Sequence, residues 1–415
     1  MFSSVLPVRS LLLAIFILMC GSGFMTTLVS MRLEDSGQRA PIIGAVATAY
    51  FIGLTLGSVQ VGRVIQQVGH IRTFAAAVSL LSASTLAYSL SENVGWWALL
   101  RFVDGLCVAA VYVCLESWLN EKAEPAARGS VLAAYMIGLY GGQAVGQYLL
   151  NLSGSASLPF VVASLLVSLA VLPVALTKTS APGTGELTPL PIRRLYAASP
   201  LGFVGVGITG VMLGAFYALG AVYAQRMGLA VSATALFMSL VIAGGVALQW
   251  PLGWLSDRFD RRLVILGAFA GTALVSAALV GSTPGVLLMT LACAFGGLSF
   301  ALYPLCVAHT NDHLSSAERV GASGGLVLIY SAGAVAGPIT ASFAIYLLGA
   351  PGLFVWISGC AFAGLIFALW RLLRRPPVPG EQQRPYQILP RTTPMAARLD
   401  PFGTAEAEES GTADL

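Results

Sequence analysis

Long hydrophobic segments alternate with short polar ones along most of the chain. Each hydrophobic segment has about 20 residues, the length that an α-helix needs to cross a hydrocarbon core of about 30 Å. We therefore expect an all-α integral membrane protein with twelve transmembrane helices in two six-helix halves. The predicted helices lie near residues 10–31, 41–62, 73–91, 95–119, 130–151, 158–177, 200–224, 232–255, 263–281, 285–309, 320–346 and 352–373.

The polar segments divide the chain into four parts. Residues 1–177 and 200–373 are predicted to form the two six-helix bundles. Residues 178–199 between them are rich in Pro, Gly and Thr, a composition typical of a linker, which we place in the cytoplasm. Residues 374–415 are Pro-rich and then acidic, which predicts a disordered cytoplasmic tail.

The composition of the chain indicates which solvent surrounds the protein. Apolar residues make up 57% of the chain and charged residues only 10%, whereas soluble domains have about a quarter of their residues charged. Lipid is therefore the expected outer solvent. The six cysteines fall within apolar segments and are interpreted as small buried hydrophobes, with no disulfide framework. The first apolar run continues to Ser30 without a small-residue cleavage site, which predicts a retained helix and not a signal peptide.

The positions of the basic residues predict the orientation. With the N-terminus inside, Arg32, Arg39 and Arg226 fall outside and Arg101 falls within the membrane, which leaves 18 of the 22 Lys and Arg residues on the inner side. Both termini are therefore expected in the cytoplasm.

The two halves show an internal repeat at a shift of 191 residues, which indicates parallel repeats of one ancestral unit. An Asn–acid pair followed by Arg recurs near the inner ends of two helices, and several glycines and a tyrosine recur elsewhere. The matched pairs are Gly62 with Gly253, Gly105 with Gly296, Tyr112 with Tyr303, Gly146 with Gly337, Asn120 with Asn311, Glu121 with Asp312, and Arg128 with Arg319.

The segment "GWLSDRFDRR" (253–262) carries a family resemblance. It is similar to the G-x-L-x-D-R-x-G-R-[KR] loop of the major facilitator superfamily, with Asp260 where the family usually has glycine. The counterpart "GRVIQQVGHIR" (62–72) keeps two glycines but has glutamines in place of the Asp-Arg pair. "RFVDG" (101–105) resembles the family's R-x-x-Q-G motif, with aspartate in place of glutamine.

The resemblance covers about residues 8–373, and "ESWLN" and "YPLCVAHTNDHL" (303–314) resemble the YcaD-like bacterial branch. It implies a multi-pass transporter of the bacterial inner membrane. In the loop motif, Gly253 would allow a tight exit from its helix, Asp257 would accept hydrogen bonds from the next helix N-terminus, and the arginines would pair with acids of the other half. The alternative is that these arginines have no gating role and only follow the positive-inside rule. The residues assigned to gating are Gly62, Gly69, Arg72, Glu116, Gly253, Asp257, Arg258, Arg261 and Arg262.

Charged residues within the predicted helix 95–119 provide the candidate transport chemistry. Arg101, Asp104, Tyr112 and Glu116 share one helical face. A charge in mid-bilayer costs about 2.5–3.5 kcal/mol, so we expect this face to line a water-reachable cavity. Arg101 would hold an anionic or polar substrate group and Asp104 would carry a proton. A static ion pair that orients the helix is the alternative, and the depth of Glu116 favours a cytoplasmic salt bridge.

The predicted helix 130–151 carries two stripes. Gly138, Gly142 and Gly146 have the spacing that lets helices approach closely. A neighbouring stripe of polar and aromatic residues includes Gln143 and Gln147. Gln147 follows Gly146, at a position where the family's antiporters tend to have proline. The weaker candidates for the cavity wall are Tyr112, Gln143, Gln147, Tyr303 and Tyr330.

The remaining motifs exclude other classes of protein. A primary pump would need a phosphate-binding G-x-x-x-x-G-K-[ST] loop, which the sequence lacks. His309 and His313 have metal-ligand spacing without the HExxH pattern, and a polar network at a helix end is preferred. We expect no enzyme activity, no cofactor and no metal site.

The sequence therefore predicts a monomeric secondary active transporter that moves a small solute by alternating access, coupled to protons, with the lipid bilayer as its other partner and no nucleic acid. A facilitative carrier, a drug or metabolite efflux antiporter and, less favoured, a non-transporting receptor are the alternatives.

Overall fold

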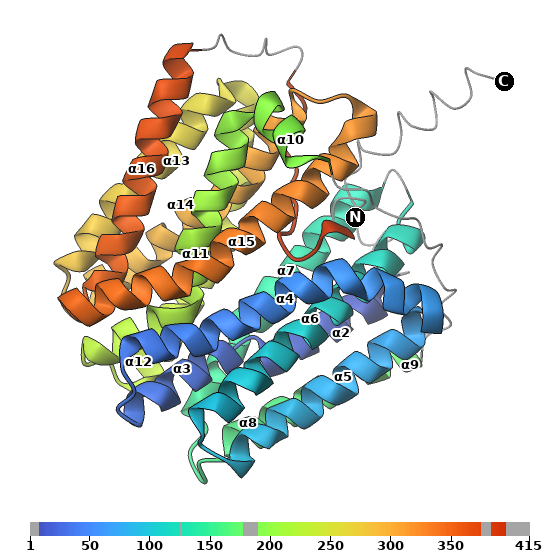
Figure 1. Ribbon diagram of the computed structural model, residues 1–415, viewed down its shortest axis with the longest axis vertical. Helices are drawn as coiled ribbons and strands as arrows, with labels where there is room; N and C mark the ends of the chain where they lie inside the picture. The colour runs from blue at the N-terminus through green and yellow to red at the C-terminus, as the bar shows by residue number, and fades with distance from the viewer. Residues whose placement is uncertain (1–7, 125–126, 177–189, 375–382, 396–415) are drawn as a thin grey trace.

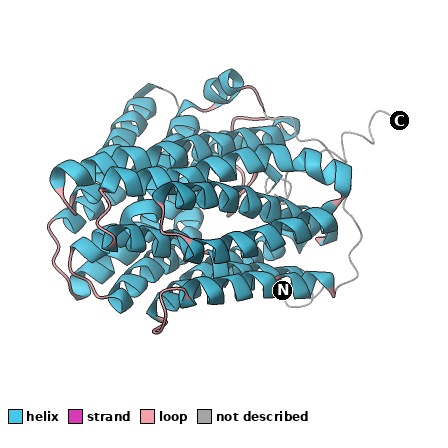
Figure 2. Cartoon of the chain, turned by 60° about the horizontal axis from the view of Figure 1, so that its bottom comes forward, coloured by secondary structure: helices cyan, strands magenta, loops and turns pink. Residues whose placement is uncertain are grey.

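The computed structural model describes residues 8–124, 127–176, 190–374 and 383–395. Within these ranges all regular secondary structure is helical, and no strand occurs (Figure 2). The predicted all-α fold is confirmed.

Two groups of helices form two halves that lie side by side, the first coloured blue to blue-green and the second yellow-green to orange-red (Figure 1). The N-terminal half consists of α2 (Arg9–Ser22), α3 (Met25–Asp35), α4 (Ala40–Val68), α5 (His70–Ala87), η2 (Tyr88–Leu90), α6 (Val94–Lys122), α7 (Arg128–Gly146), η4 (Gln147–Asn151), α8 (Leu158–Leu169) and α9 (Val171–Ala175). The C-terminal half consists of α11 (Pro200–Arg226), α12 (Val231–Arg258), α13 (Arg261–Val280), α14 (Val286–Asn311), α15 (Ser316–Leu348) and α16 (Gly352–Arg374). A short helix, α10 (Ile192–Ala198), falls within the predicted linker.

Eleven helical segments in the described ranges are long and apolar enough to cross a membrane, with α2 and α3 counted together as Arg9–Asp35. The expected span at 130–151 is occupied by α7 and η4, which are not among the eleven. Large apolar side chains such as Val286, Leu347 and Leu373 remain exposed on the outside. An apolar exterior of this kind suits lipid. The helices suit it as well, because their backbone polar groups form hydrogen bonds within each segment.

Local sequence explains where several helices begin. The side chain of Asn93 accepts a hydrogen bond from the backbone N–H of Trp96 at the start of α6, and Ser199 does the same at the start of α11. Ser315 and Glu318 form a reciprocal capping box at the start of α15. Gly69 has a φ of +88°, which favours glycine, and it forms the turn between α4 and α5.

Close glycine contacts reproduce the 191-residue repeat. Gly105 of α6 packs against the backbone oxygen of Tyr50 in α4, and a side chain at this position would collide with it. The matched position Gly296 of α14 packs in the same way against the oxygen of Val241 in α12. The partners are themselves related by 191 residues, as they are for Gly53 on Phe102 and Gly244 on Cys293, for Gly146 on Cys20 and Gly337 on Val211, and for Gly142 on Phe16 and Gly333 on Gly207.

The halves meet directly at one end of the molecule, where α3 lies against α11. The Arg226 guanidinium makes two hydrogen bonds to the Glu34 carboxylate, at 2.7 and 2.9 Å. Nearby, the Ser30 hydroxyl donates to the carbonyl of Ala218 at 2.8 Å. We call this the Glu34 end. The opposite end, which holds the loop between α12 and α13, is called the Asp257 end.

Candidate functional site

A cavity of about 110 Å³ lies between the two halves. Helices α2, α3, α4, α6 and α7 of the N-terminal half and α11 and α15 of the C-terminal half contribute to its wall. The Tyr217 hydroxyl of α11 donates to the side-chain oxygen of Gln143 in α7 at 3.3 Å, so the cavity is bridged by a bond between the halves. Arg391 and Thr392, from the segment after α16, also line it.

Three of the predicted wall residues line this cavity: Tyr112, Gln143 and Tyr330. The other two are not among the lining residues. Gln147 is buried behind Gln143 and its amide nitrogen lies 3.4 Å from the Gln143 carbonyl. The Tyr303 ring is buried against the edge of Tyr330, with 5.4 Å between the ring centroids, and therefore supports the wall from behind.

The predicted pairing of Arg101 with Asp104 is confirmed, at 3.6 Å between guanidinium nitrogen and carboxylate oxygen. Both residues are only 2% exposed. The Asp104 carboxylate also accepts hydrogen bonds from Ser84 at 2.6 Å and from Tyr88 at 2.7 Å. The Arg101 guanidinium lies 4.6 Å from the centroid of the Tyr50 ring. Ser84, Tyr88 and Tyr50 thus hold the pair in the N-terminal half.

Tyr50 lines the cavity, whereas Arg101 and Asp104 do not in this conformation. The rotation of α6 turns Asp104 toward Ser84 in α5 and Tyr88 in η2, which lie within its own half. A contact between Arg101 and substrate therefore stays a prediction. The Nε and Nη1 atoms of Arg101 are buried and have no hydrogen-bond partner in the described part of the chain, and unpaired buried donors are rare in folded proteins.

The loop motif differs from expectation at Gly253. Helix α12 continues to Arg258, so the prediction of a tight helix exit at Gly253 is wrong. The missing side chain instead leaves space for the ring of Tyr386, which would collide with any Cβ at this position. Asp260 accepts a hydrogen bond from the backbone N–H of Arg262 at 3.0 Å and begins α13. The residue that departs from the family pattern therefore supplies the helix cap that the sequence analysis assigned to Asp257.

The arginines of this loop have partners in their own half. Arg261 is buried and makes ion pairs with Asp257 at 3.0 Å and with Asp312 at 2.6 Å. These two pairs do not bridge the halves, contrary to the expectation for the motif. The Arg258 guanidinium lies 4.0 Å from the ring centroid of Trp254. Arg262 makes an ion pair with Asp260 at 2.6 Å.

Two acids of this end have shifted pKa values. Burial alone would raise the pKa of Asp260, but hydrogen bonds and charge from Arg262 outweigh it and lower the pKa. Burial raises the pKa of Asp312, and the neighbouring Arg261 opposes this without cancelling it. The loop is therefore an electrostatically coupled unit and not a set of independent surface charges.

The remaining residues assigned to gating lie in the N-terminal half. Gly62 lies within α4 and has open space beside it, and Gly69 forms the turn described above. Arg72 is exposed near the start of α5. Glu116 is fully buried and accepts hydrogen bonds from Tyr135 at 3.0 Å and from the hydroxyls of Thr392 and Thr393. Glu116 therefore binds the segment that follows α16.

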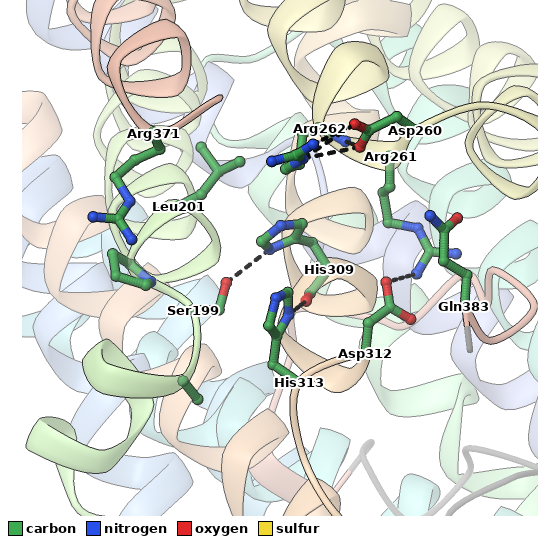
Figure 3. Close-up of a pocket in the computed structure, with 12 residues that line it drawn as sticks. Ser199, Leu201, Asp260, Arg261, Arg262, His309, Asp312, His313, Arg371 and Gln383 are labelled. Carbon is green, nitrogen blue, oxygen red and sulfur yellow. Dashed lines mark hydrogen bonds and ion pairs between the residues drawn. The ribbon is translucent and has the colours of Figure 1, made fainter. Parts of the chain in front are cut away.

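The two histidines lie in a polar cluster at the Asp257 end (Figure 3). A ring nitrogen of His309 lies 2.8 Å from the hydroxyl of Ser199, and His313 donates to the backbone carbonyl of His309 at 2.8 Å. The bond from His309 connects the end of α14 to the start of α11, and the bond from His313 stays within the end of α14.

Tyr50, Tyr140, Tyr217 and Arg391 line the cavity and Phe300 lies next to Arg391, and none of these was among the candidates from sequence. Aromatic residues in apolar helices are most often core residues, so pattern alone does not single them out. Tyr140 carried a usable signal, because it belongs to the same helical stripe as Gln143 and Gln147. Arg391 carried none, since its surroundings in sequence are typical of disorder.

Two repeated helical halves that enclose a cavity and expose an apolar surface define a polytopic membrane transporter. The family model of the Major Facilitator Superfamily matches residues 11–302 and 203–401, and the chain belongs to this family of non-enzymatic transporters. An uncharacterized MFS-type transporter of Yersinia pestis (strain Pestoides F) is 32% identical over 386 residues, which cover 92% of this chain and 98% of that protein. The uncharacterized MFS-type transporter YcaD of Escherichia fergusonii is 28% identical over 371 residues, covering 88% and 95%. The resemblance to the YcaD-like branch is confirmed.

Solved structures show the same fold at low identity. The nucleoside transporter NupG matches with a TM-score of 0.74 and 14% identity, covering 87% of this chain and 98% of its own. A D-xylose-proton symporter matches with a TM-score of 0.65 and 14% identity, covering 90% and 99%. An inward-facing, occupied bacterial homologue of the lysosomal transporter Spinster matches with a TM-score of 0.66 and 16% identity, covering 98% and 96%.

Proposed function

We propose that this protein is a proton-coupled secondary active carrier of a small solute, which works by alternating access as a monomer in the bacterial inner membrane. The observation that carries the proposal is the cavity between two repeated halves, closed on one side by the pairing of Glu34 with Arg226. A solute bound there reaches one side of the membrane when this pair is intact and the other side when it breaks. The proton-coupled and nucleoside-transporting fold neighbours support a carrier of small polar solutes.

The positions of the basic residues support an assignment of the two ends to the two sides of the membrane. The Asp257 end carries Arg258, Arg261 and Arg262 and is placed in the cytoplasm. The Glu34 end then faces outside. Because the direct contacts between halves at the Glu34 end close the outer side, the conformation belongs to the inward-facing part of the cycle.

The pair of Arg101 and Asp104 is the proposed proton site. Asp104 is a buried carboxylate, and Arg101 is its one neighbouring cation among the described residues, so its proton affinity depends on where the Arg101 guanidinium lies. The Arg101 guanidinium lies over the ring of Tyr50, and Tyr50 also lines the cavity. A solute that displaces Tyr50 would move Arg101, and this would couple solute binding to the protonation of Asp104.

The test is proton movement in proteoliposomes that contain the pH-sensitive dye pyranine. Uridine, D-xylose, succinate and agmatine are added in turn, as probes of four chemical classes. We expect at least one probe to move protons through the wild type but not through Asp104→Asn, which still folds by gel filtration. Solute uptake without proton movement would support the facilitative carrier instead, and equal proton movement in both proteins would contradict the role of Asp104.

A further inference from the structure

Residues 383–395 follow a defined path from the Asp257 end into the cavity. The backbone N–H of Arg384 donates to Asp312 at 3.2 Å, and the carbonyl of Arg384 accepts from Arg261 at 2.7 Å. The backbone N–H of Tyr386 donates to Asp257 at 2.8 Å. The prediction of disorder therefore does not hold for this segment. Asp257 and Arg261 of the loop motif, together with Asp312, thus bind the main chain of residues 383–395.

The same segment carries Arg391 into a group of aromatic rings. Its guanidinium lies 4.3 Å from the ring centroid of Phe300 and 5.6 Å from those of Tyr140 and Tyr330. It also lies 3.4 Å from the hydroxyl of Tyr217. All three rings are within the distance of about 6 Å at which a ring face attracts a cation. Tyr140 comes from the N-terminal half and the other rings from the C-terminal half, so the ring group spans the interface.

A carboxylate binds the segment directly after Arg391. The Glu116 carboxylate is fully buried and accepts hydrogen bonds from Thr392 and Thr393, the two residues that follow Arg391. Aromatic faces together with a carboxylate are the chemistry that recognises organic cations, and guanidinium is well suited because it is planar and weakly hydrated.

From these contacts we infer that Phe300, Tyr140, Tyr330 and Tyr217 form a cation site for solutes that carry a guanidinium or ammonium group, and that Arg391 occupies this site as a ligand from the protein's own chain. The inference rests on the proposed carrier function and assigns its substrate class. The contacts of Arg391 use only its guanidinium, so a free cation can make the same ones.

Occupation by Arg391 has two consequences. A ligand on the same chain acts at an effective concentration on the order of millimolar, so a free cation must compete with it and binds with reduced apparent affinity. The segment also contacts both halves through Glu116 and Asp257, so its presence opposes the rearrangement that alternating access requires. Removal of the Arg391 charge should therefore increase both binding and transport of a cation.

The experiment compares agmatine binding to the full-length wild type and Arg391→Gln by isothermal titration calorimetry in detergent. We expect agmatine to bind Arg391→Gln about tenfold more tightly or better, and its neutral analogue N-butylurea to bind neither protein. The matched control is Arg374→Gln, which removes the same charge from the end of α16, where the side chain lies near Trp370. In the Arg391→Gln background, Phe300→Leu should abolish the binding while gel filtration shows a folded protein. Equal affinity of agmatine for the wild type and Arg391→Gln, or no binding to either, would overturn the inference.

Uptake into proteoliposomes separates this inference from the proposed function. Radiolabelled agmatine and D-xylose are followed in the wild type and in Arg391→Gln. Uptake of xylose that agmatine does not inhibit would retain the carrier function and overturn the cation site. Tight agmatine binding to Arg391→Gln without uptake of either probe would retain the cation site and overturn the carrier function.

Discussion

At the scale of single residues, the surroundings of Asp104 decide how a charge is kept within the membrane. Ser84 and Tyr88 donate to the carboxylate and Arg101 balances its charge. Removal of one partner from a buried ion pair costs about 3–5 kcal/mol, because the other charge remains buried and uncompensated. Loss of one hydrogen bond to a charged group costs about 1.5–3 kcal/mol.

We therefore expect Asp104→Asn to lower the free energy of unfolding by about twice as much as Ser84→Ala. The measurement is unfolding by SDS in mixed micelles, followed by tryptophan fluorescence. Two equal decreases would show that Asp104 is neutral in the folded protein and that no ion pair exists.

Glycine positions give a second prediction with a matched control. Gly105 packs against the backbone of Tyr50, so Gly105→Ala would force α4 and α6 apart, at a cost of about 1–3 kcal/mol or more. Gly62 also lies within α4 but has open space beside it, and Gly62→Ala should be neutral or stabilise by up to about 1 kcal/mol through helix propensity. The melting temperatures of the two variants in detergent would test this. Similar melting temperatures would contradict the packing.

Asp260 gives a prediction about pH. Its pKa is lowered from the ordinary value of 3.8, because hydrogen bonds from Arg262 outweigh the effect of burial. A lowered pKa in the folded state contributes stability that is fully present above the unfolded value and is lost as the pH falls through the folded value. The wild type should thus exceed Asp260→Asn in melting temperature by a constant amount from pH 5 to 8, and by less below pH 4. The control is Glu92→Gln, on an exposed loop. A difference that grows on acidification would contradict the assignment.

At the scale of helices, we propose that the contact between α3 and α11 closes the outer side. Glu34 and Arg226 form the bidentate pair at this contact. We expect Glu34→Gln to weaken it and to increase the time that the outer side is open. Ser30 lies buried at the same contact. In a background without native cysteines, the thiol of the Ser30→Cys variant should then react faster with a membrane-impermeant maleimide.

Glu92→Gln, which removes an acid from a loop outside this contact, should leave the rate of labelling unchanged. Unchanged labelling of Ser30→Cys in Glu34→Gln would show that the pair does not control access.

The helices themselves were predictable because lipid imposes length and hydrophobicity on each of them. The repeat was predictable for a similar reason, since Gly105 and Gly296 keep the same backbone contact in both halves. The spacing of Arg101 and Asp104 also predicted their pairing. The direction in which α6 presents them was not predictable, because helix rotation depends on packing against Ser84 and Tyr88 in other elements.

At the scale of the whole molecule, the cavity depends on parts that lie far apart in the sequence. Tyr140, Tyr217 and Phe300 come from three helices of two halves, and each alone is indistinguishable from a core aromatic residue. The path of residues 383–395 could not be predicted from the sequence for a different reason. Composition reports whether a segment can fold alone, and this segment is ordered by contacts with Asp257, Asp312 and Glu116 instead.

The central claim is that the two halves alternate in opening the cavity to the two sides of the membrane. The most direct measurement is double electron–electron resonance on two pairs of spin labels, at Ser36 and Ala230 for the Glu34 end and at Gln67 and Phe259 for the Asp257 end, all exposed positions. With Arg391→Gln and agmatine in nanodiscs, we predict that the first distance distribution gains a longer component while the second gains a shorter one. If both distributions stay fixed, or if both ends open together, alternating access is contradicted.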